Sequence, residues 1–492
     1  MTDQPSNSAA RGPIQPATGT RDFYPIELAR RRWIEDKWRT TAIRHGFEEI
    51  DGPTFEPTEL YTRKSGDGII SEIFGVYSGK DEARVKQMGE RLAQGDTGAI
   101  APYALRPEFT PTLARMFAAR AGQLPKPTKW FWQQNCYRAE KPQRGRLREF
   151  MQWNCDIIGG MPRPETPAGE SAAAPDGGGE WNRANAELDA EIIACCVELL
   201  RRCGLTSSNM KVRFNDRSVL GAIIARLGVE QEHHGAAFTL IDRRGKMEDA
   251  DLEAMAFEFG IHSIEFLNFL KRPRSSDEDL ETSLQSLPVY SPDDAKRLLA
   301  PLSGLKNLLE QAGCVDWCEV DMNIARGLAY YTGMVFEVIV DGERAVAGGG
   351  RYDNLIATFG GPPTPAVGFG MGDVVLSLVL QDKGLMPSDK QIAADLKLRP
   401  DAFVISNGTP QSDALVSDVL AKLRRDGLHA RRSYKSTGKI GKLMKEASDA
   451  HSRYAIIIES DTEITLKDMD ANTQDRGPRA ELLARITPPL SR

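Results

Sequence analysis

The segment WFWQQNCYRAEKPQRGRLREFMQWNCDIIG, residues 130–159, decides the fold of this chain. Two runs rich in aromatic and polar residues flank a loop that contains Gly145, which predicts two antiparallel strands joined by a long tip. Alternate side chains of the second strand face opposite sides of a sheet, so its apolar residues should form core. The apolar set is Met151, Trp153, Cys155 and Ile157, and the opposite face carries Arg148, Phe150, Gln152, Asn154 and Asp156.

The polar-rich face of this strand is predicted to be the floor of a ligand site. Buried polar side chains cost free energy unless they have partners, so Arg, Gln and Asp on a central strand favour ligand binding over packing. The alternative from these residues alone is the solvated face of an open sheet. The hairpin tip suits contact with phosphate groups, because five basic residues face two acidic ones. These are Arg138, Lys141, Arg144, Arg146 and Arg148, with Glu140 and Glu149.

Three glycine-containing stretches follow later in the chain. In VDMNIARGLAYYTGMVFEVIV, residues 320–340, Arg326 lies in a strand pair beside a glycine and two tyrosines, which favours an anion ligand in a pocket. In AVAGGGRYDNL, residues 345–355, three glycines directly after a strand would let the backbone approach a ligand closely. An ordinary glycine-rich turn has the same composition. AVGFGMGDVVLSLVL, residues 366–380, predicts a glycine-rich strand that runs into an apolar helix, for a site or for core packing.

Length and composition exclude several classes of protein. The 492 residues suggest roughly three domains, and 41% hydrophobic and 27% charged residues are typical of soluble globular proteins. No apolar run approaches the ~18 residues of a membrane helix, and the first 13 residues lack the apolar part of a secretory signal. Seven cysteines without a CxxC or HExxH motif predict free thiols in a reducing cytoplasm and no structural metal. Without GxxxxGK[ST], a Walker-type nucleotide site is excluded.

The remaining pattern predicts alternating elements and two connections. Helices are expected at 22–46, 110–120, 186–203, 411–426 and 438–450, and extended segments at 47–60, 211–215, 402–406, 429–433, 454–459 and 463–469. Residues 79–100 predict a charged surface hairpin or excursion, and Thr110 is expected to cap the helix that follows it. Residues 159–186, rich in Gly, Pro and Ala, predict a disordered insertion. Residues 385–400 predict a linker before a last α/β domain of about five strands, in which 463–469 is the final strand.

Together these segments resemble the histidyl-tRNA synthetases, a family of class II aminoacyl-tRNA synthetases, over nearly the whole chain from about residue 19. The first helix and the strand at Pro53 resemble the dimer-forming first motif, and residues 137–159 resemble the second motif. Further matches are GTRDFYP at 19–25, ALRPEFT at 104–110, RGLAYYTG at 326–333 and GGGRYDNL at 348–355. The last two are similar to the two histidine-specific signatures, and no other synthetase family combines them with this second motif.

The resemblance implies an α/β fold: a class II antiparallel sheet flanked by helices, with a helical insertion and a C-terminal α/β anticodon-binding domain. The implied parts are a flexible tail at 1–18, the first catalytic part at 19–215 with the insertion 159–186, a helical insertion domain at 216–315, the second catalytic part at 316–385, a linker at 386–400 and the anticodon-binding domain at 401–492. The implied activity is ATP-dependent attachment of histidine to its tRNA through histidyl-adenylate. ATP would be a substrate accompanied by Mg²⁺, without a protein-bound structural metal, and the protein would be a cytoplasmic homodimer that contacts no membrane.

The resemblance also assigns roles to individual residues. Arg138 would hold the ATP α-phosphate and the substrate carboxylate, and Arg326 would stabilise the charge that develops on the α-phosphate, where other class II enzymes use a metal ion. Both would be catalytic and would contact ATP. The other ATP residues would be Glu140 and Phe150, which frame the adenine. The histidine residues would be Glu108, Thr110 and Gln152 at the amino group and Asp156, Tyr330 and Tyr331 at the imidazole. The tRNA residues would be Gln143, at the extra 5′ guanosine, and Arg431 and Arg432.

Two departures from the family pattern leave two functions open. The family usually has Asp at the position of Ala329, and Glu-Arg at the positions of Val374 and Val375, where the Arg is expected to clamp the ATP γ-phosphate. Loss of that charge-assisted bond, worth ~1.5–3 kcal/mol, should weaken ATP binding without abolishing catalysis. Asp373 changes the charge pattern further. The chain is then either a working enzyme from a divergent branch or a histidine-binding regulatory paralogue without aminoacylation activity.

The basic C-terminal segment favours the enzyme. Between residues 421 and 446, nine basic residues face two acidic ones, a balance of +7, although the whole chain carries −6 and the remainder therefore −13. A basic patch in an otherwise acidic protein is typical of nucleic-acid contact, and a solvated helix face is the alternative. The sequence GKIGKLMKEASDAHSRYAIIIES resembles the anticodon-binding domain of the family, which the shorter regulatory paralogues usually lack.

Overall fold

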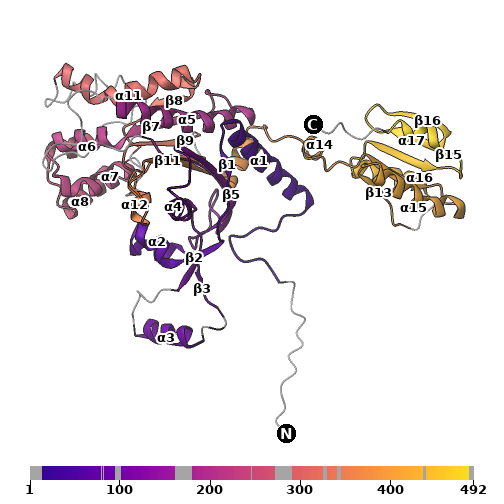
Figure 1. Ribbon diagram of the computed structural model, residues 1–492, viewed down its shortest axis with the longest axis horizontal. Coiled ribbons are helices and arrows are strands. Elements are labelled where there is room, and N and C mark those ends of the chain that lie inside the picture. The colour runs from indigo at the N-terminus through magenta and orange to yellow at the C-terminus, as the bar shows by residue number, and fades with distance from the viewer. Residues whose placement is uncertain are drawn as a thin grey trace, which may run out of the picture. The chain divides into compact units, whose positions relative to one another are not determined.

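A computed structural model describes ten segments of the chain, separated by short gaps. They are residues 14–78, 80, 82–94, 101–160, 180–244, 247–271, 291–324, 330–340, 345–435 and 439–486. Arg326, Ala329 and most of the predicted insertion at 159–186 lie outside these residues. The chain forms two compact units, Met1–Asp22 with Ile34–Met386 and Phe23–Trp33 with Pro387–Arg492 (Figure 1).

The first unit is built on an eight-stranded sheet whose six central strands are antiparallel. In spatial order the strands are β1 (Glu48–Glu49), β5 (Thr128–Tyr137), β6 (Glu149–Ile158), β11 (Ala366–Gly372), β10 (Ala347–Arg351), β9 (Met334–Ile339), β7 (Lys211–Asp216) and β8 (Cys318–Val320). Only the edge strands β1 and β8 pair in parallel with their neighbours in this sheet. The antiparallel sheet flanked by helices confirms the fold class predicted from the sequence.

The β5–β6 hairpin forms as its alternating pattern predicts. Its ten-residue strands pair from Thr128 opposite Ile158 to Tyr137 opposite Glu149. The apolar face of β6 is core: Trp153 is fully buried and stacks on Trp38 at a ring-centroid distance of 6.1 Å. Because β11 pairs with the other edge of β6, the strand is central and its polar face is enclosed by neighbouring strands.

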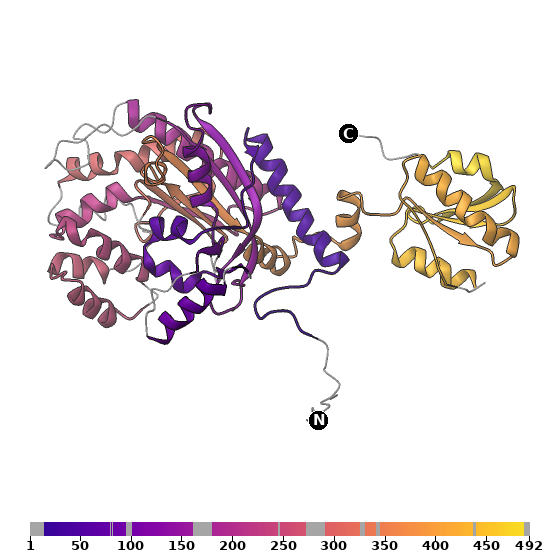
Figure 2. The same cartoon turned by 60° about the horizontal axis from the view of Figure 1, so that its bottom comes forward.

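Helices cover the sheet and gather beyond its β7 side. The described helices are α1 (Pro25–Arg44, shared by both units), α2 (Thr58–Ser65), α3 (Glu82–Ala93), α4 (Thr110–Ala118), α5 (Glu180–Arg202), α6 (Arg217–Arg226), α7 (His234–Arg243), α8 (Asp249–Glu258), α9 (Ile264–Leu270), α11 (Pro292–Gln311), α12 (Leu355–Thr358) and α13 (Asp373–Asp382), with 3₁₀ turns η1 (Asp67–Glu72), η2 (Gln231–His233) and η3 (Val315–Trp317). Helix α5 packs on β6 and β11, and the group α6 to α9 with α11 forms the predicted helical insertion (Figures 1 and 2).

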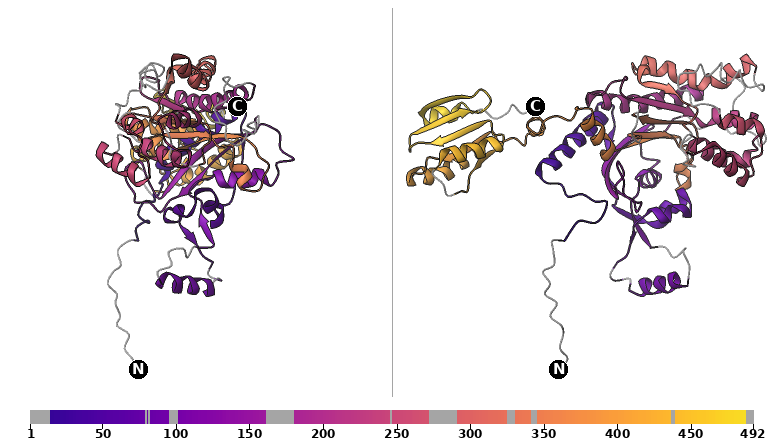
Figure 3. Two further views of the ribbon diagram at one scale, coloured as in Figure 1. Left: turned by 90° about the vertical axis from the view of Figure 1, so that its left-hand side faces the viewer. Right: turned by 180° about the vertical axis from the view of Figure 1, so that it is seen from behind.

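Residues 79–100 were predicted to form a charged surface hairpin or excursion, and the described part contains helix α3, which lies apart from the large sheet (Figures 1 and 3). The helix forms because EARVKQMGERLA consists mainly of good helix formers. Two other local predictions in this unit are wrong. Helix α5 begins at Glu180, within the segment predicted to be disordered. Thr110 is the first residue of α4 and provides no cap, since Phe109 precedes the helix without a side-chain hydrogen bond.

The extended region predicted at 47–60 divides into shorter elements. After β1 the chain enters β2 (Phe55–Pro57), which pairs in a small sheet with β4 (Tyr103–Leu105), and β4 pairs with β3 (Gly75–Val76). Pro57 directly precedes α2, so the last three residues of the predicted extended run are helical. The small sheet brings α2 and the turn before α4 to the large sheet, where the pocket described below lies.

The second unit contains the α/β domain predicted at the C-terminal end. Its elements are α14 (Asp389–Asp395), β12 (Ala402–Ser406), α15 (Pro410–Arg425), β13 (Ala430–Arg432), α16 (Ile440–Asp449), β14 (Tyr454–Ile458), β15 (Glu463–Asp468), β16 (Thr473–Pro478) and α17 (Arg479–Ala484). The five strands lie in the order β13-β12-β14-β15-β16, with apolar clusters on both faces. The predicted final strand is β15, but β16 follows it, because TQDRGP pairs as a polar edge strand. The predicted linker contains helix α14.

No helix in the described parts of the chain is both long enough and apolar enough to cross a membrane.

Candidate active site

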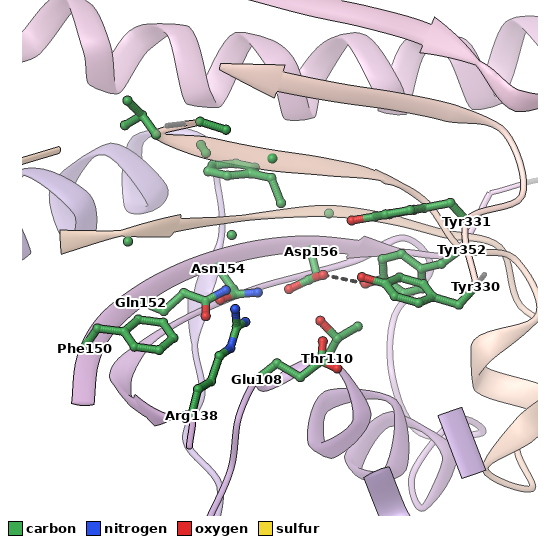
Figure 4. A pocket seen from close by; sticks show the side chains of 18 residues that line it. Glu108, Thr110, Arg138, Phe150, Gln152, Asn154, Asp156, Tyr330, Tyr331 and Tyr352 are labelled. Carbon is green, nitrogen blue, oxygen red and sulfur yellow. Dashed lines mark hydrogen bonds between the residues drawn. The ribbon is translucent and has the colours of Figure 1, made fainter. Parts of the chain in front are cut away.

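A pocket of about 230 Å³ lies on the polar face of the large sheet. Strand β6 provides its floor, strands β10 and β11 a second wall, and the turn before α4 closes one side (Figure 4). The lining residues are Glu108, Thr110, Arg138, Phe150, Gln152, Asn154, Asp156, Tyr330, Tyr331, Ala345, Val346, Ala347, Gly348, Tyr352, Gly368, Phe369, Gly370 and Gly372. Of the residues that the alternating pattern places on this face, Phe150, Gln152, Asn154 and Asp156 line the pocket, whereas Arg148 does not.

The floor of the pocket is lined by polar side chains that have almost no surface exposed to solvent. Asn154 is 4% exposed and Asp156 is 2% exposed, yet Asn154 Oδ1, Asp156 Oδ2 and Gln152 Oε1 are buried without a hydrogen-bond partner among the described residues. Buried acceptors without partners cost roughly 1–3 kcal/mol each, so such a row persists where a ligand supplies the missing donors. The three acceptors lie along one strand face and point into the same cavity (Figure 4).

Glycines in β11 make room for this floor. A Cβ atom on Gly368 would overlap Asp156 Oδ1, and one on Gly370 would overlap Gln152 Nε2. The register pairs Gly368 with Asp156 and Gly370 with Asn154, so a larger residue at either glycine would push the floor side chains out of place. The glycine run GGG was predicted to follow a strand and to let the backbone approach a ligand closely, with an ordinary turn as the alternative. It lies within β10 itself, where a Cβ on Gly349 would strike the backbone of β11.

Tyr352 holds the carboxylate at the far end of the floor. Its hydroxyl donates to Asp156 Oδ1 at 2.5 Å, and the Tyr352 side chain is 2% exposed. Burial raises the pKa of Asp156 from 3.8 to about 7, although the Tyr352 hydrogen bond and the Lys64 charge lower it. The Tyr330 and Tyr331 rings lie beside this pair at 4.5 Å from each other, as expected from the sequence. Tyr352 was not among the predicted site residues, because in GGGRYDNL the glycines were the feature from which a site was inferred.

Arg138 and Phe150 form the opposite end of the pocket. The Arg138 guanidinium lies over the Phe150 ring at 5.2 Å, and Arg138 Nε donates to the Pro107 carbonyl at 3.1 Å. This arrangement places a cation beside an apolar ring face, a surface suited to an anionic group attached to a planar ring. Glu108 and Thr110 reach the pocket from the turn before α4, and Glu108 pairs with Lys64, a second residue that sequence reasoning missed.

The other predicted site residues lie outside the pocket lining. Glu140 is in the β5–β6 connection and accepts from Arg146, and Gln143 makes backbone bonds of 3.0 and 2.9 Å with the same residue. Arg431 and Arg432 belong to β13 of the second unit. No group of three or more His, Cys, Asp or Glu in the described ranges is arranged to hold a metal ion.

Asp373 fastens the beginning of β6. Its carboxylate is 2% exposed, accepts from the Met151 amide at 2.9 Å and pairs with Arg21 at 2.7 Å. The Gly19 carbonyl accepts from the amides of Arg148 and Glu149 at 2.8 and 3.3 Å, so the segment before α1 contacts the same strand end. Phe150 stands between these two attachments. The departure noted at Asp373 is therefore a buried ion pair that supports the aromatic wall of the pocket.

Comparisons with known proteins show which family the chain resembles. The sequence model of the family described as Histidyl-tRNA synthetase matches residues 19–163 and 180–372. The chain is 34% identical over 482 residues to the histidine–tRNA ligase of Opitutus terrae, covering 96% of this chain and 98% of that protein. It is 31% identical over 486 residues to the histidine–tRNA ligase of Pyrococcus horikoshii, covering 97% and 100%.

Solved structures share the fold at lower identity. The crystal structure of histidyl-tRNA synthetase from Nostoc sp. PCC 7120 superposes with a TM-score of 0.69 at 21% identity, covering 97% of this chain and 99% of that chain. A structure from Bacillus halodurans, described as an ATP phosphoribosyltransferase regulatory subunit/histidyl-tRNA synthetase, gives a TM-score of 0.62 at 18% identity and covers 88% and 97%. At these identities the likeness concerns the fold.

Substituting Gly368 should destabilise the protein. In Gly368→Ala the new methyl group would displace the Asp156 carboxylate and press on the Cys155 carbonyl, so we expect a loss of about 2 kcal/mol in the free energy of unfolding. Gly372→Ala is the matched control, because it lies on the same strand with nothing within 4 Å of the added carbon. Urea unfolding measures both, and equal midpoints would contradict the packing described here.

The Asp373 ion pair should contribute more to stability than an exposed pair on the same helix. Asp373→Ala removes the acceptor for the Met151 amide and the ion pair with Arg21, so we expect a loss of about 2 kcal/mol. Asp382→Ala is the control, because its pair with Arg144 at 2.6 Å has both side chains more than half exposed and should cost less than about 1 kcal/mol. If thermal melts show the same midpoint for both variants, Asp373 does not hold the strand end.

Proposed function

The chain belongs to the histidyl-tRNA synthetase family, and from this premise we propose that its pocket is the centre where histidine and ATP react to form histidyl-adenylate. The protein is an aminoacyl-tRNA ligase that attaches histidine to tRNA, with ATP as a substrate. The observation that carries the proposal for the site is the buried carboxylate of Asp156, in the pocket lining. One of its oxygens accepts from Tyr352, and the other is buried without a hydrogen-bond partner among the described residues.

The pocket matches the two ends of histidine. Gln152 and Asp156 lie on one face of β6, roughly 13 Å apart along the strand at 3.3 Å per residue. Their side chains can therefore serve opposite ends of one amino acid. We assign the amino group to Glu108, Thr110 and Gln152, and the imidazole to Asp156, Tyr330 and Tyr331, as the family resemblance implies. Asp156 Oδ2 then accepts from a ring N–H, because an ionised carboxylate is an acceptor only.

ATP is assigned to the end of the pocket with Arg138 and Phe150. The histidine carboxylate attacks the α-phosphorus, the bond between the α-phosphorus and the bridging oxygen of the β-phosphate breaks, and pyrophosphate leaves. Mg²⁺ would accompany the phosphates as part of the ATP substrate. Arg138 stabilises the developing charge, because a fixed cation in a site with little water need not reorganise during the reaction. The Phe150 ring supports the adenine, with Glu140 at its edge. A catalytic role for Arg326 rests on the family resemblance alone, since this residue lies outside the described ranges.

The same proposal includes tRNA, a second subunit and the compartment. Gln143 would contact the acceptor end of the tRNA from the β5–β6 connection, whereas Arg431 and Arg432 would contact the anticodon stem. A homodimer is supported by apolar side chains on the small sheet, where Phe55 is 51% exposed and packs edge-on against Tyr103 at 5.8 Å. We place the reaction in the cytoplasm because all seven cysteines are free buried thiols.

The regulatory alternative has less support. The histidine–tRNA ligases of two distant organisms align over nearly the whole chain, including the C-terminal unit that the shorter paralogues usually lack. The likeness to the Bacillus halodurans structure reaches only 18% identity and concerns the fold. Histidine-dependent exchange of pyrophosphate into ATP, followed by charging of a histidine tRNA, tests the enzyme directly.

Histidine use should depend on the ionisation of Asp156. Because burial raises its pKa to about 7, the carboxylate is ionised above and protonated below that pH, so kcat/KM for histidine should fall as the pH drops through 7. Asp156→Asn cannot titrate and should raise the histidine KM roughly tenfold at pH 8, because charge assistance is lost. Its acid limb should move towards the pKa of free imidazole, ~6.5.

Asp156→Ala should cost more than Asp156→Asn, because the Tyr352 hydroxyl loses its buried acceptor. The ATP KM should stay within about twofold for both variants. Pyrophosphate exchange across pH 6 to 9 gives both constants, and thermal melts control for folding. An unchanged acid limb in Asp156→Asn would remove Asp156 from imidazole recognition.

Neutralising the β13 arginines should weaken tRNA binding. Arg431→Gln with Arg432→Gln should lower tRNA affinity and reduce the salt slope, since each phosphate contact contributes to it. The control is Arg476→Gln with Arg485→Gln: Arg476 lies on β16, the opposite edge of the same sheet, and Arg485 follows that strand after α17. Pyrophosphate exchange without tRNA should be the same in all variants. Equal salt slopes for the two double variants would place the tRNA elsewhere.

A further inference from the structure

We propose that Lys64 is a positioning residue for histidine recognition, which holds the Glu108 carboxylate and the Tyr330 ring at the two parts of the amino-acid pocket. This inference rests on the function proposed for the pocket. Lys64 lies on α2, which directly follows a strand of the small sheet. Its side chain reaches Glu108 in the turn before α4.

The burial of Lys64 calls for an explanation beyond packing. Its side chain is 1% exposed, whereas lysine almost always keeps its ammonium in water. The preceding Arg63 shows the ordinary arrangement on the same helix, since it is 56% exposed and pairs with Glu59 one turn away. An apolar side chain would fill the space of Lys64 without the desolvation cost of a charge. The fold instead retains a cation at this point.

The ammonium of Lys64 contacts two residues of the pocket. Its Nζ donates to Glu108 Oε2 at 2.5 Å and lies 3.8 Å from the centroid of the Tyr330 ring. Within the described ranges, Glu108 accepts hydrogen bonds through Oε2 alone, so its second oxygen is left for the amino group of the substrate. The cation–π contact fixes one face of the Tyr330 ring, while Tyr331 lies 4.5 Å from that ring. The Lys64 ammonium thus orients both Glu108, which is assigned to the substrate amino group, and Tyr330, which is assigned to the imidazole.

The charge of Lys64 also acts on Asp156. The ionisable groups that face this part of the pocket are Lys64 from α2, Glu108 from the turn before α4, Arg138 after β5, Asp156 from β6, and Tyr330, Tyr331 and Tyr352. Burial lowers the pKa of Lys64, and Glu108 and Asp156 raise it, while Lys64 in turn lowers the pKa of Asp156. Removing the Lys64 charge should therefore raise the pKa of Asp156 and leave a smaller fraction of it ionised at neutral pH.

The test compares Lys64→Met and Lys64→Arg with Lys129→Met. Lys129 is a matched control, because it pairs with Glu191 at 2.8 Å and lies 4.7 Å from the Phe47 ring, away from the pocket. Histidine and ATP KM are measured by pyrophosphate exchange from pH 6 to 9. In Lys64→Met we expect the histidine KM to rise at least tenfold at pH 7.5, the ATP KM to stay within twofold, and the acid limb for histidine to move to higher pH.

Lys64→Arg keeps the charge and should return the histidine KM to within about threefold of the natural protein, while Lys129→Met should change no constant more than twofold. If Lys64→Met does not fold, Lys64→Gln takes its place with the same expectations. The inference is overturned if the natural protein exchanges pyrophosphate and the uncharged variant keeps its histidine KM and acid limb, or if both KM values rise together without rescue by arginine. Absence of exchange in the natural protein would instead overturn the proposed function itself.

Discussion

The Asp156 carboxylate fills the space that a Cβ atom on Gly368 would occupy. The rest of the pocket depends on this steric fit between two paired strands. The Asp156 carboxylate fits on this central strand because the paired residue of the neighbouring strand is a glycine, which has no Cβ atom. Once that space exists, the buried carboxylate needs a donor, which Tyr352 supplies from the end of β10. One charged group on the inner face of the sheet thus requires the glycines of β11, their register with β6 and the buried Tyr352 hydroxyl.

The elements in which apolar and polar residues alternate with a short period could be predicted from the sequence. Strand β6 alternates strictly, so its floor residues and core residues could be separated correctly before any coordinates were known. Lys64 and Tyr352 could not be found in this way, because their roles come from contacts with Glu108 and Asp156 that lie 44 and 196 residues away in the chain. The glycine run was expected directly after a strand and not within one for a similar reason, since glycine inside β10 is explained by its contacts with the neighbouring strand.

Charged side chains at the pocket contact residues from other elements. Lys64 of α2 pairs with Glu108 in the turn before α4, and Arg138, which follows β5, lies over the Phe150 ring of β6. Behind the pocket, Arg351 of β10 is 3% exposed and pairs with Asp189 of α5 at 2.6 Å, so the strand that carries the glycine run is fixed to the helix beneath the sheet. Because each pair joins different elements, the geometry of the site is set by the assembled domain and by no single motif.

The attachment of Asp373 to Arg21 has a consequence for biosynthesis. The two residues are 352 positions apart, and between them they clamp the strand end that carries Phe150. A ribosome makes the N-terminal partner first and the C-terminal one only after three quarters of the chain has been translated. During that interval the carboxylate that binds both Arg21 and the Met151 amide is absent. The beginning of β6 can therefore gain these two contacts only after translation has passed the start of α13, late in the synthesis of the chain.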